Sequence, residues 1–188
     1  GCILISLGFS GCSEKQATPS TPDNEQATGD DISLDTSPIP TVGCTDPSVA
    51  ATNMTVDMTV DGLKRTFHFS APAAEAGVAL PLMMAFHGGG GANEAFPQQE
   101  AFNQLVQSEN MIMVYPVGHL VSPNEGEWQL NTTGSTLHDV RFVQAIIDEL
   151  STRYCLDSKR LYATGYSLGS MFTYEVACHM NHRFAAVA

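Results

Sequence analysis

The most constraining feature of this chain is a glycine–serine turn set between an apolar segment and a helical one. Residues 165–169 read GYSLG, the apolar segment LYAT precedes them over 161–164, and helical spacing follows over 168–180. A serine in this setting lies at a strained strand-to-helix junction, and the glycines two residues to either side let neighbouring backbone pass without Cβ clashes. The pattern therefore predicts a sheet covered by helices, with an exposed and nucleophilic hydroxyl at Ser167.

Short apolar segments alternate with helical ones along the chain from about residue 44. Strands are predicted over 80–86, 111–115, 160–164 and 184–188, and helices over 94–110, 137–154 and 168–180. Before them, alternating residues on either side of Asp61 and Gly62 predict an antiparallel hairpin over 54–60 and 63–70. The fold class is thus α/β, with a mostly parallel sheet that is covered on both faces and begins with an antiparallel hairpin.

A run of four glycines, residues 88–91, follows the apolar strand at 80–86 and His87. Acyl-transfer chemistry needs two backbone N–H donors, one from the residue after the nucleophile and one from the loop after an earlier strand. We expect Leu168 and Gly89 to supply them, with Gly88 and Gly90 letting the backbone approach a substrate carbonyl. A merely flexible loop is the alternative. His87 is expected to be structural and not a general base.

The catalytic base has no candidate in the sequence. In this fold the acid and the histidine follow the nucleophile in the chain. His179 and His182 lie three or four turns along the helix after Ser167, about 15 Å or more away, and His68, His119 and His138 precede Ser167. We therefore expect the base and the acid to lie beyond Ala188, and the 188 residues alone to be inactive.

Loops that follow parallel strands leave the sheet at one edge, where α/β folds bind ligands. The long polar loop over 117–135 contains Trp128, the single tryptophan of the chain. One hypothesis is that Trp128 lines a substrate cleft beside Ser167, and plain packing of the indole ring is the alternative.

The N-terminal segment predicts export. Residues 1–11 are uncharged and apolar but too short to span a bilayer, which is typical of a signal peptide whose start is missing. The sequence FSGC over 9–12 resembles a bacterial lipobox with Phe9 where leucine is usual, so Cys12 is a candidate for lipidation and membrane anchoring. An ordinary signal peptide that contains a cysteine is the alternative. Ser13 after this cysteine resembles the outer-membrane sorting pattern of Gram-negative lipoproteins.

Residues 13–43 are rich in Ser, Thr, Pro and acidic residues, which predicts a disordered linker. The domain organisation is then a signal peptide over 1–12, a linker over 13–43 and a folded domain over 44–188. The expected location is extracellular or at the cell surface.

A formal net charge of −12 argues against a nucleic-acid partner, because nothing in the sequence resembles a basic patch that could neutralise phosphates. No metal or organic cofactor is implied. The Cys, His and Asp residues lack metal-ligand spacing, and the glycine run lacks the G-x-x-x-x-G-K-[ST] phosphate-binding pattern.

Three cysteines belong to the predicted domain: Cys44, Cys155 and Cys178. Disulfides are expected in an exported protein. Cys155 precedes the strand that leads to Ser167, and Cys178 lies about 15 Å along a helix that returns antiparallel to that strand. This places both cysteines at the same end of the sheet and predicts a Cys155–Cys178 bridge. Cys44 competes for either partner or pairs with a cysteine outside these 188 residues, and buried free thiols remain an alternative.

Four segments carry a family resemblance. They are LPLMMAFHGGGG (80–91), MIMVYPVG (111–118), HDVRFVQAIIDELSTRYCLDSKRLYATGYSLGSMFTYEVAC (138–178) and RFAAVA (183–188). Together they resemble the extracellular polyhydroxybutyrate depolymerase and feruloyl esterase family of α/β-hydrolases, which also includes acetyl-xylan esterases. The resemblance covers about residues 54–188 and so the N-terminal part of the α/β-hydrolase fold, cut after the nucleophile helix.

By this resemblance Ser167 is the nucleophile, the backbone near Gly89 supports the oxyanion, and the family's catalytic Asp and His lie later in the chain. Asp139 matches an acidic position of the family, but its place at a helix start predicts helix capping. Leu168 and Ser170 depart from the asparagine and glycine that members often carry, which leaves the subfamily open.

The expected function is therefore that of an exported serine carboxylic-ester hydrolase that works through an acyl-enzyme on Ser167. Its substrates would be feruloyl or acetyl esters of plant polysaccharide, or polyhydroxybutyrate. A serine peptidase or acyltransferase of the same fold is one alternative. A non-catalytic, surface-tethered binding protein is the alternative from another class.

Overall fold

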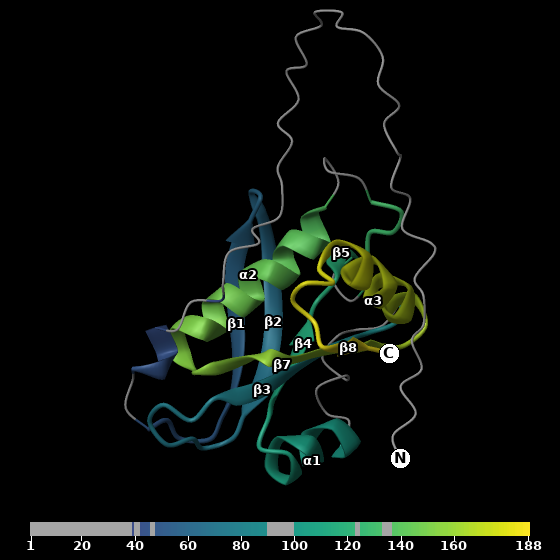
Figure 1. Ribbon diagram of the computed structural model, residues 1–188. Helices are drawn as coiled ribbons and strands as arrows, with labels where there is room; N and C mark the ends of the chain where they lie inside the picture. Colours follow the sequence, from purple (N-terminus) through teal and green to yellow (C-terminus); the bar gives the residue numbers. More distant parts are fainter. Residues whose placement is uncertain (1–38, 40–41, 46–47, 90–99, 123–124, 133–136) are drawn as a thin grey trace, which may run out of the picture. The chain divides into compact units, whose positions relative to one another are not determined.

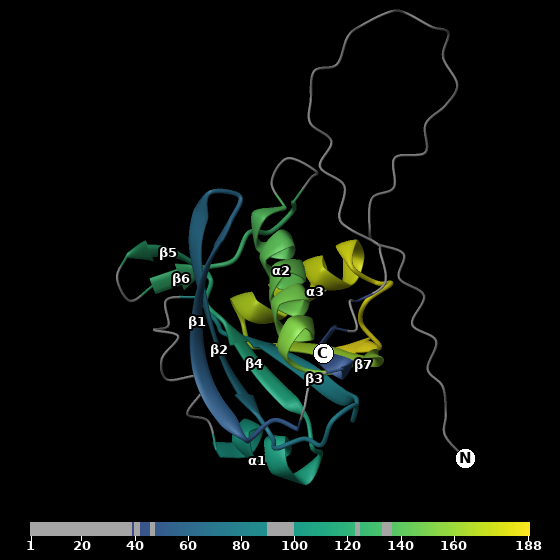
Figure 2. The ribbon, with the colours of Figure 1, turned by 90° about the vertical axis from the view of Figure 1, so that its left-hand side faces the viewer.

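A mixed sheet forms the framework of the computed structural model, which describes residues 39, 42–45, 48–89, 100–122, 125–132 and 137–188 (Figures 1 and 2). In these residues six strands lie in the order β1-β2-β4-β3-β7-β8. The strands are β1 (Thr52–Val60), β2 (Leu63–Ala71), β3 (Leu80–Phe86), β4 (Ile112–Pro116), β7 (Leu156–Gly165) and β8 (Ala186–Val187). Strands β4, β3, β7 and β8 are parallel, whereas β1 and β2 add an antiparallel hairpin at one side. The predicted α/β class is confirmed.

The hairpin turn is the two-residue turn that the sequence predicts. Asp61 and Gly62 have φ angles of 52° and 76°, and positive φ at both central residues is what a type I′ turn requires. Val60 pairs with Leu63 across the turn.

Alternate residues of the central strands face two separate cores. Leu82, Met84 and Phe86 of β3 join the cluster under α2 (His138–Arg153) and α3 (Leu168–His179), which lie on one face of the sheet (Figure 1). Met83 and Ala85 join the cluster under α1 (Glu100–Ser108) on the other face. Strands β3 and β4 are apolar on both faces, which explains why their sequences are continuous apolar runs.

Two elements differ from the expectation. The segment predicted as a polar loop contains a two-stranded ribbon of β5 (His119–Ser122) and β6 (Glu125–Glu127). Strand β7 begins at Leu156, four residues earlier than predicted, because Leu156 already pairs with Leu80. Helix α1 begins at Glu100, and the first part of the helix predicted over 94–110 lies outside the described residues.

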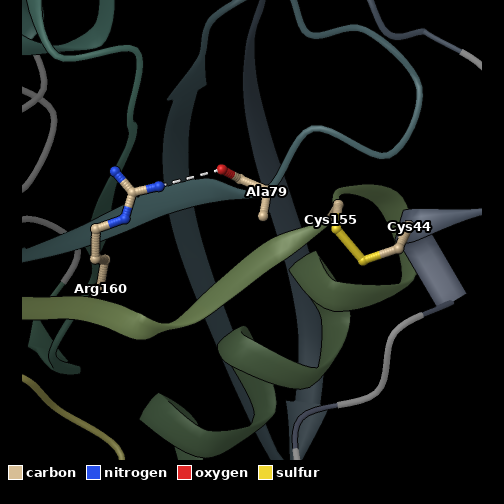
Figure 3. Close-up of a disulfide and its surroundings, with 4 residues drawn as sticks. All are labelled: Cys44, Ala79, Cys155 and Arg160. Carbon is tan, nitrogen blue, oxygen red and sulfur yellow. Dashed lines mark hydrogen bonds between the residues drawn. A yellow bond between two sulfur atoms is a disulfide. The ribbon is translucent and has the colours of Figure 1, made fainter.

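A disulfide joins Cys44 to Cys155, so the predicted Cys155–Cys178 bridge is wrong (Figure 3). Cys44 ends the short helix η1 (Val42–Cys44), and its Cα lies 4.1 Å from that of Cys155. The close approach depends on Gly43, where a Cβ would lie 2.4 Å from the backbone of Tyr154. Beside the bridge, Arg160 donates a 3.4 Å hydrogen bond to the carbonyl of Ala79 (Figure 3).

The folded part begins before the predicted boundary at residue 44. Ile39 is buried in the larger core, and η1 covers residues 42–44. The predicted signal peptide, with Cys12, and the linker up to residue 38 lie outside the described residues. Among the helices that the structure describes, none is long and apolar enough to cross a membrane.

Candidate active site

Ser167 occupies the turn between β7 and α3. It has φ 52° and ψ −120°, a conformation that costs energy for a residue with a side chain. Neighbouring backbone holds the turn: Tyr166 N–H donates to the carbonyl of Phe86 at 3.1 Å, and Ser170 N–H donates to the carbonyl of Ser167 at 2.9 Å. The serine therefore stands at a strained strand-to-helix junction, as the motif predicts.

The two glycines of the motif are required by close backbone contact. A Cβ on Gly165 would lie 2.2 Å from the carbonyl oxygen of Gly169. A Cβ on Gly169 would lie 2.2 Å from the carbonyl oxygen of Phe86 and 2.5 Å from that of His87. The end of β3, the end of β7 and the start of α3 thus touch through their main chains.

The described part of the glycine loop lies against Ser167 and Leu168. A Cβ on Gly88 would be 3.3 Å from Ser167 Cβ, and a Cβ on Gly89 would be 3.2 Å from Leu168 Cδ2. Within the described residues, no group accepts a hydrogen bond from the N–H of Gly89 or of Leu168. The expected oxyanion donors are therefore neighbours with available N–H groups. Gly90, predicted to belong to this loop, lies outside the described residues.

His87 is buried at the start of this loop. Its Nε2 accepts a hydrogen bond from Gly118 N–H at 2.9 Å, so the proton is on Nδ1, which donates to the carbonyl of Gly88 at 2.6 Å. Burial lowers the pKa of His87, a shift that the Gly88 carbonyl and the Asp139 carboxylate oppose. The imidazole is held neutral with both nitrogens occupied, which agrees with a structural role.

Trp128 is a core residue. Its ring is 4% exposed and stacks on Phe172 with centroids 4.6 Å apart. It also meets Phe86 edge-on at 5.3 Å, and its Nε1–H donates to the carbonyl of His87 at 2.9 Å. The structure thus shows the packing alternative. The buried indole supports the His87 loop through this hydrogen bond and does not line an exposed cleft.

The predicted capping role of Asp139 is wrong. Asp139 is 1% exposed in the first turn of α2, and its Oδ1 accepts a 2.6 Å hydrogen bond from Arg65 Nη1. Its Oδ2 accepts one from Gln129 N–H at 2.7 Å. Burial lowers the pKa of the Arg65 guanidinium, and the Asp139 carboxylate opposes this shift. The carboxylate therefore pairs with a buried cation and does not cap the helix.

Sequence reasoning missed Arg65, although one signal was present. Arg65 follows the same two-residue period as Phe67 and Phe69, which are buried on the inner face of β2. An arginine that alternates in step with buried aromatic residues is expected to be buried as well. Its charge then needs a buried partner, which in this chain is Asp139.

His179, the first histidine after Ser167, is bonded to other residues. His179 Nε2 lies 3.1 Å from Thr132 Oγ1 and 3.6 Å from Glu175 Oε2, which ties the end of α3 to the loop before α2. In the described part of the chain, no histidine makes a hydrogen bond to the Ser167 hydroxyl.

The sheet order, the strained serine after β7 and the glycine loop after β3 together define an α/β-hydrolase fold. Solved structures with this architecture include the acetyl xylan esterase from Aspergillus awamori, with a TM-score of 0.54 at 19% identity over 71% of this chain and 50% of that chain. A CE1 ferulic acid esterase from Anaeromyces mucronatus matches with a TM-score of 0.53 at 13% identity over 71% of this chain and 55% of that one. The predicted fold is confirmed.

Several proteins that are similar in sequence are also named as esterases. The chain is 31% identical over 127 residues to a bifunctional acetylxylan esterase/xylanase from Neocallimastix patriciarum, which covers 68% of this chain and 18% of the relative. It is 28% identical to the putative esterase NocK from Nocardia uniformis subsp. tsuyamanensis over 76% of this chain and 42% of the relative. It is 24% identical to feruloyl esterase B from Piromyces equi over 58% of this chain and 20% of the relative.

No protein-family model matches the chain. The predicted resemblance to feruloyl and acetylxylan esterases is nevertheless confirmed by these relatives. The chain spans between 18% and 42% of the length of the three.

Proposed function

We propose that this chain is the nucleophile-bearing part of a serine carboxylic-ester hydrolase. The observation that carries the proposal is the strained Ser167 turn packed against a glycine loop, with the N–H groups of Gly89 and Leu168 both available beside it. In this mechanism the Ser167 hydroxyl attacks the ester carbonyl, and the alcohol leaves to give an acyl-enzyme that water then hydrolyses.

The oxyanion that forms during this attack is bound by two backbone groups. Leu168 N–H lies at the N-terminus of α3, where the helix dipole adds positive potential. Gly89 N–H comes from the facing loop. Donors fixed before the reaction stabilise the tetrahedral intermediate without reorganisation, and such a donor is worth about 10²–10³ in rate.

The general base and its orienting acid are proposed to lie after Ala188. His87 is excluded as the base because both of its ring nitrogens are occupied by backbone groups. The chain covers about half of the solved esterases that it resembles, which leaves room for a histidine and an acid in the remaining part of the fold.

The proposed substrates are acetyl or feruloyl esters on plant polysaccharide, with polyhydroxybutyrate as the polymer alternative. Relatives named acetylxylan esterase and feruloyl esterase support the first class. Measuring acetate release from acetylated xylan, ferulate release from methyl ferulate and hydroxybutyrate release from the polyester, with the whole protein, separates the three.

Export is part of the proposal. The Cys44–Cys155 disulfide supports an oxidising compartment, and a lipid on Cys12 would tether the enzyme to the cell surface. If Cys12 is lipidated, the Cys12→Ala variant loses incorporation of labelled palmitate and appears in the soluble fraction. Equal labelling of both proteins contradicts the anchor.

The nucleophile is tested with a fluorophosphonate probe on the whole protein. The expected result is one labelled peptide containing Ser167, with labelling and hydrolysis of p-nitrophenyl acetate both lost in Ser167→Ala. Ser108→Ala is the control, because it removes an exposed hydroxyl at the end of α1, on the other face of the sheet from α3, and should keep both. Hydrolysis that survives in Ser167→Ala contradicts the mechanism.

A further inference from the structure

One continuous series of hydrogen bonds joins a buried ion pair to the glycine loop beside Ser167. It begins at Arg65 on β2, whose Nη1 donates to Asp139 at 2.6 Å and whose Nη2 donates to the carbonyl of Val117 at 3.1 Å. The side chains of Arg65 and Asp139 are 2% and 1% exposed. The guanidinium also lies 4.1 Å from the ring centre of Phe142, so its orientation is fixed on three sides.

The second step passes through a single peptide group. The Val117 carbonyl and the Gly118 N–H belong to the same peptide unit, and Gly118 N–H donates to His87 Nε2 at 2.9 Å. A cation at the carbonyl end of a peptide makes its N–H a stronger donor, because hydrogen bonds in series polarise one another. Gly118 is held in place by close packing, since a Cβ there would lie 2.7 Å from the carbonyl oxygen of Glu127.

The third step ends at the proposed oxyanion donor. His87 Nδ1–H donates to the Gly88 carbonyl at 2.6 Å, and that carbonyl shares its peptide unit with Gly89 N–H. Each group in the series donates in the same direction, from Arg65 toward Gly89. The Gly89 N–H has no acceptor among the described residues, so it is the free end of the series.

We propose that Arg65, held by Asp139, is a positioning residue that orients and polarises the Gly89 N–H through the Val117–Gly118 peptide and His87. The inference rests on the proposed esterase function. It gives a part in that function to the buried Arg65 guanidinium, which lies outside the GYSLG motif. Arg65 touches neither Ser167 nor substrate in this role. It acts by presetting one of the two donors that the tetrahedral intermediate needs.

If this ion pair has a purely structural role, a variant that folds without it should keep its kcat. Replacing a buried ion pair by apolar residues of similar size is often neutral or stabilising, whereas removing one partner leaves a buried charge. The double variant Arg65→Met/Asp139→Leu therefore separates the two roles, because it can keep the fold while it removes the start of the series.

The experiment uses the whole protein and p-nitrophenyl acetate. In Arg65→Met/Asp139→Leu we expect kcat to fall about 10-fold with KM within about 2-fold, since complete loss of an oxyanion donor costs about 10²–10³. Arg65→Lys, which keeps the charge, should recover part of the loss. The matched control is Arg153→Met/Glu149→Leu, which removes the ion pair at the far end of α2 and should leave kcat unchanged.

A folded Arg65→Met/Asp139→Leu variant with the kcat of the unaltered protein overturns the proposal. So does a loss of kcat that only follows the loss of folded protein, as measured by its circular dichroism melt.

A second measurement does not depend on activity. With ¹⁵N-glycine labelling, and Gly89→Ala to assign the signal, the Gly89 amide proton should move upfield in the double variant and stay in place in the Arg153 control. If the unaltered protein hydrolyses no ester, the esterase proposal fails, and this shift alone decides whether the series exists. An unmoved Gly89 signal overturns it.

Discussion

The two glycines that flank Ser167 have no room for a side chain. Because a Cβ on Gly169 would meet the Phe86 carbonyl at 2.2 Å, Gly169→Ala should force β3 and α3 apart and destabilise the fold by about 2–4 kcal/mol. Urea unfolding of the whole protein measures this.

Gly62→Ala is the matched control for this strain. Gly62 has φ 76° and open space around it, so alanine there costs only the left-handed conformation, about 1 kcal/mol. Equal losses at Gly62 and Gly169 would show that steric contact at the turn is unimportant.

His87 predicts a pH dependence of stability at the same scale. Its pKa is lowered by burial, so the unfolded chain takes up a proton at a higher pH than the folded protein does. The stability that the neutral imidazole contributes is present above its usual pKa of about 6.5, and is lost as the pH falls toward the lowered value.

The urea midpoint of the unaltered protein should therefore fall more between pH 7 and pH 5 than that of His87→Gln, which cannot take up the proton. The other histidines are present in both proteins and cancel in this comparison. Parallel pH profiles of the two midpoints would contradict a neutral, buried His87.

At the scale of elements, the Cys44–Cys155 bridge joins η1 to the segment that enters β7 across 111 residues. Closing a loop of this length in the unfolded chain stabilises the fold by about 5 kcal/mol in the chain-entropy model. Cys44→Ser/Cys155→Ser should lower the free energy of unfolding by up to this amount, measured by urea denaturation. A loss below about 1 kcal/mol would mean that the unfolded chain already keeps these segments together.

The β1–β2 hairpin is joined to α2 by a second contact between elements. Asp61 at the hairpin tip accepts hydrogen bonds from His138 and from Arg141 at the start of α2. Partial burial raises the pKa of Asp61, but the hydrogen bonds from His138 and Arg141 outweigh it, and the net shift is downward. This contact should therefore be lost at acid pH, as Asp61 becomes protonated.

Asp61→Asn keeps the turn conformation, which asparagine tolerates, and removes the charge. Because the pair is partly exposed, we expect a loss of less than about 1 kcal/mol at pH 7. The difference between the two proteins in urea should disappear at low pH. A difference that persists there would point to the turn and not to the ion pair.

For the whole molecule, the sequence predicts best those features that a single short segment determines. The apolar run at 80–86 matches β3, and the GYSLG turn predicts the β7–α3 junction, because period and turn chemistry are local properties. The Cys44–Cys155 bridge and the Arg65–Asp139 pair join residues 111 and 74 positions apart. Such pairings depend on which segments meet in space, which no local pattern encodes, so the cysteine pairing was wrong and Arg65 was missed.

The position of each strand in the sheet predicts how stability is distributed over the molecule. Strand β3 pairs with β4 on one side and β7 on the other, and most of its side chains are buried on both faces. In the described sheet β1 pairs with β2, and much of β1 is exposed. Amides of central, buried strands open only with global unfolding, whereas edge strands open locally at lower free energy.

Hydrogen exchange of the whole protein should therefore be slowest over 82–86 and 112–115, and faster by at least about tenfold over 52–58, because each 1.4 kcal/mol of local opening free energy changes the rate tenfold. Mass spectrometry of peptic peptides measures this at the needed resolution. Uniform protection of β1 and β3 would mean that the hairpin is covered by a part of the protein outside the described residues, and that the sheet unfolds as one unit.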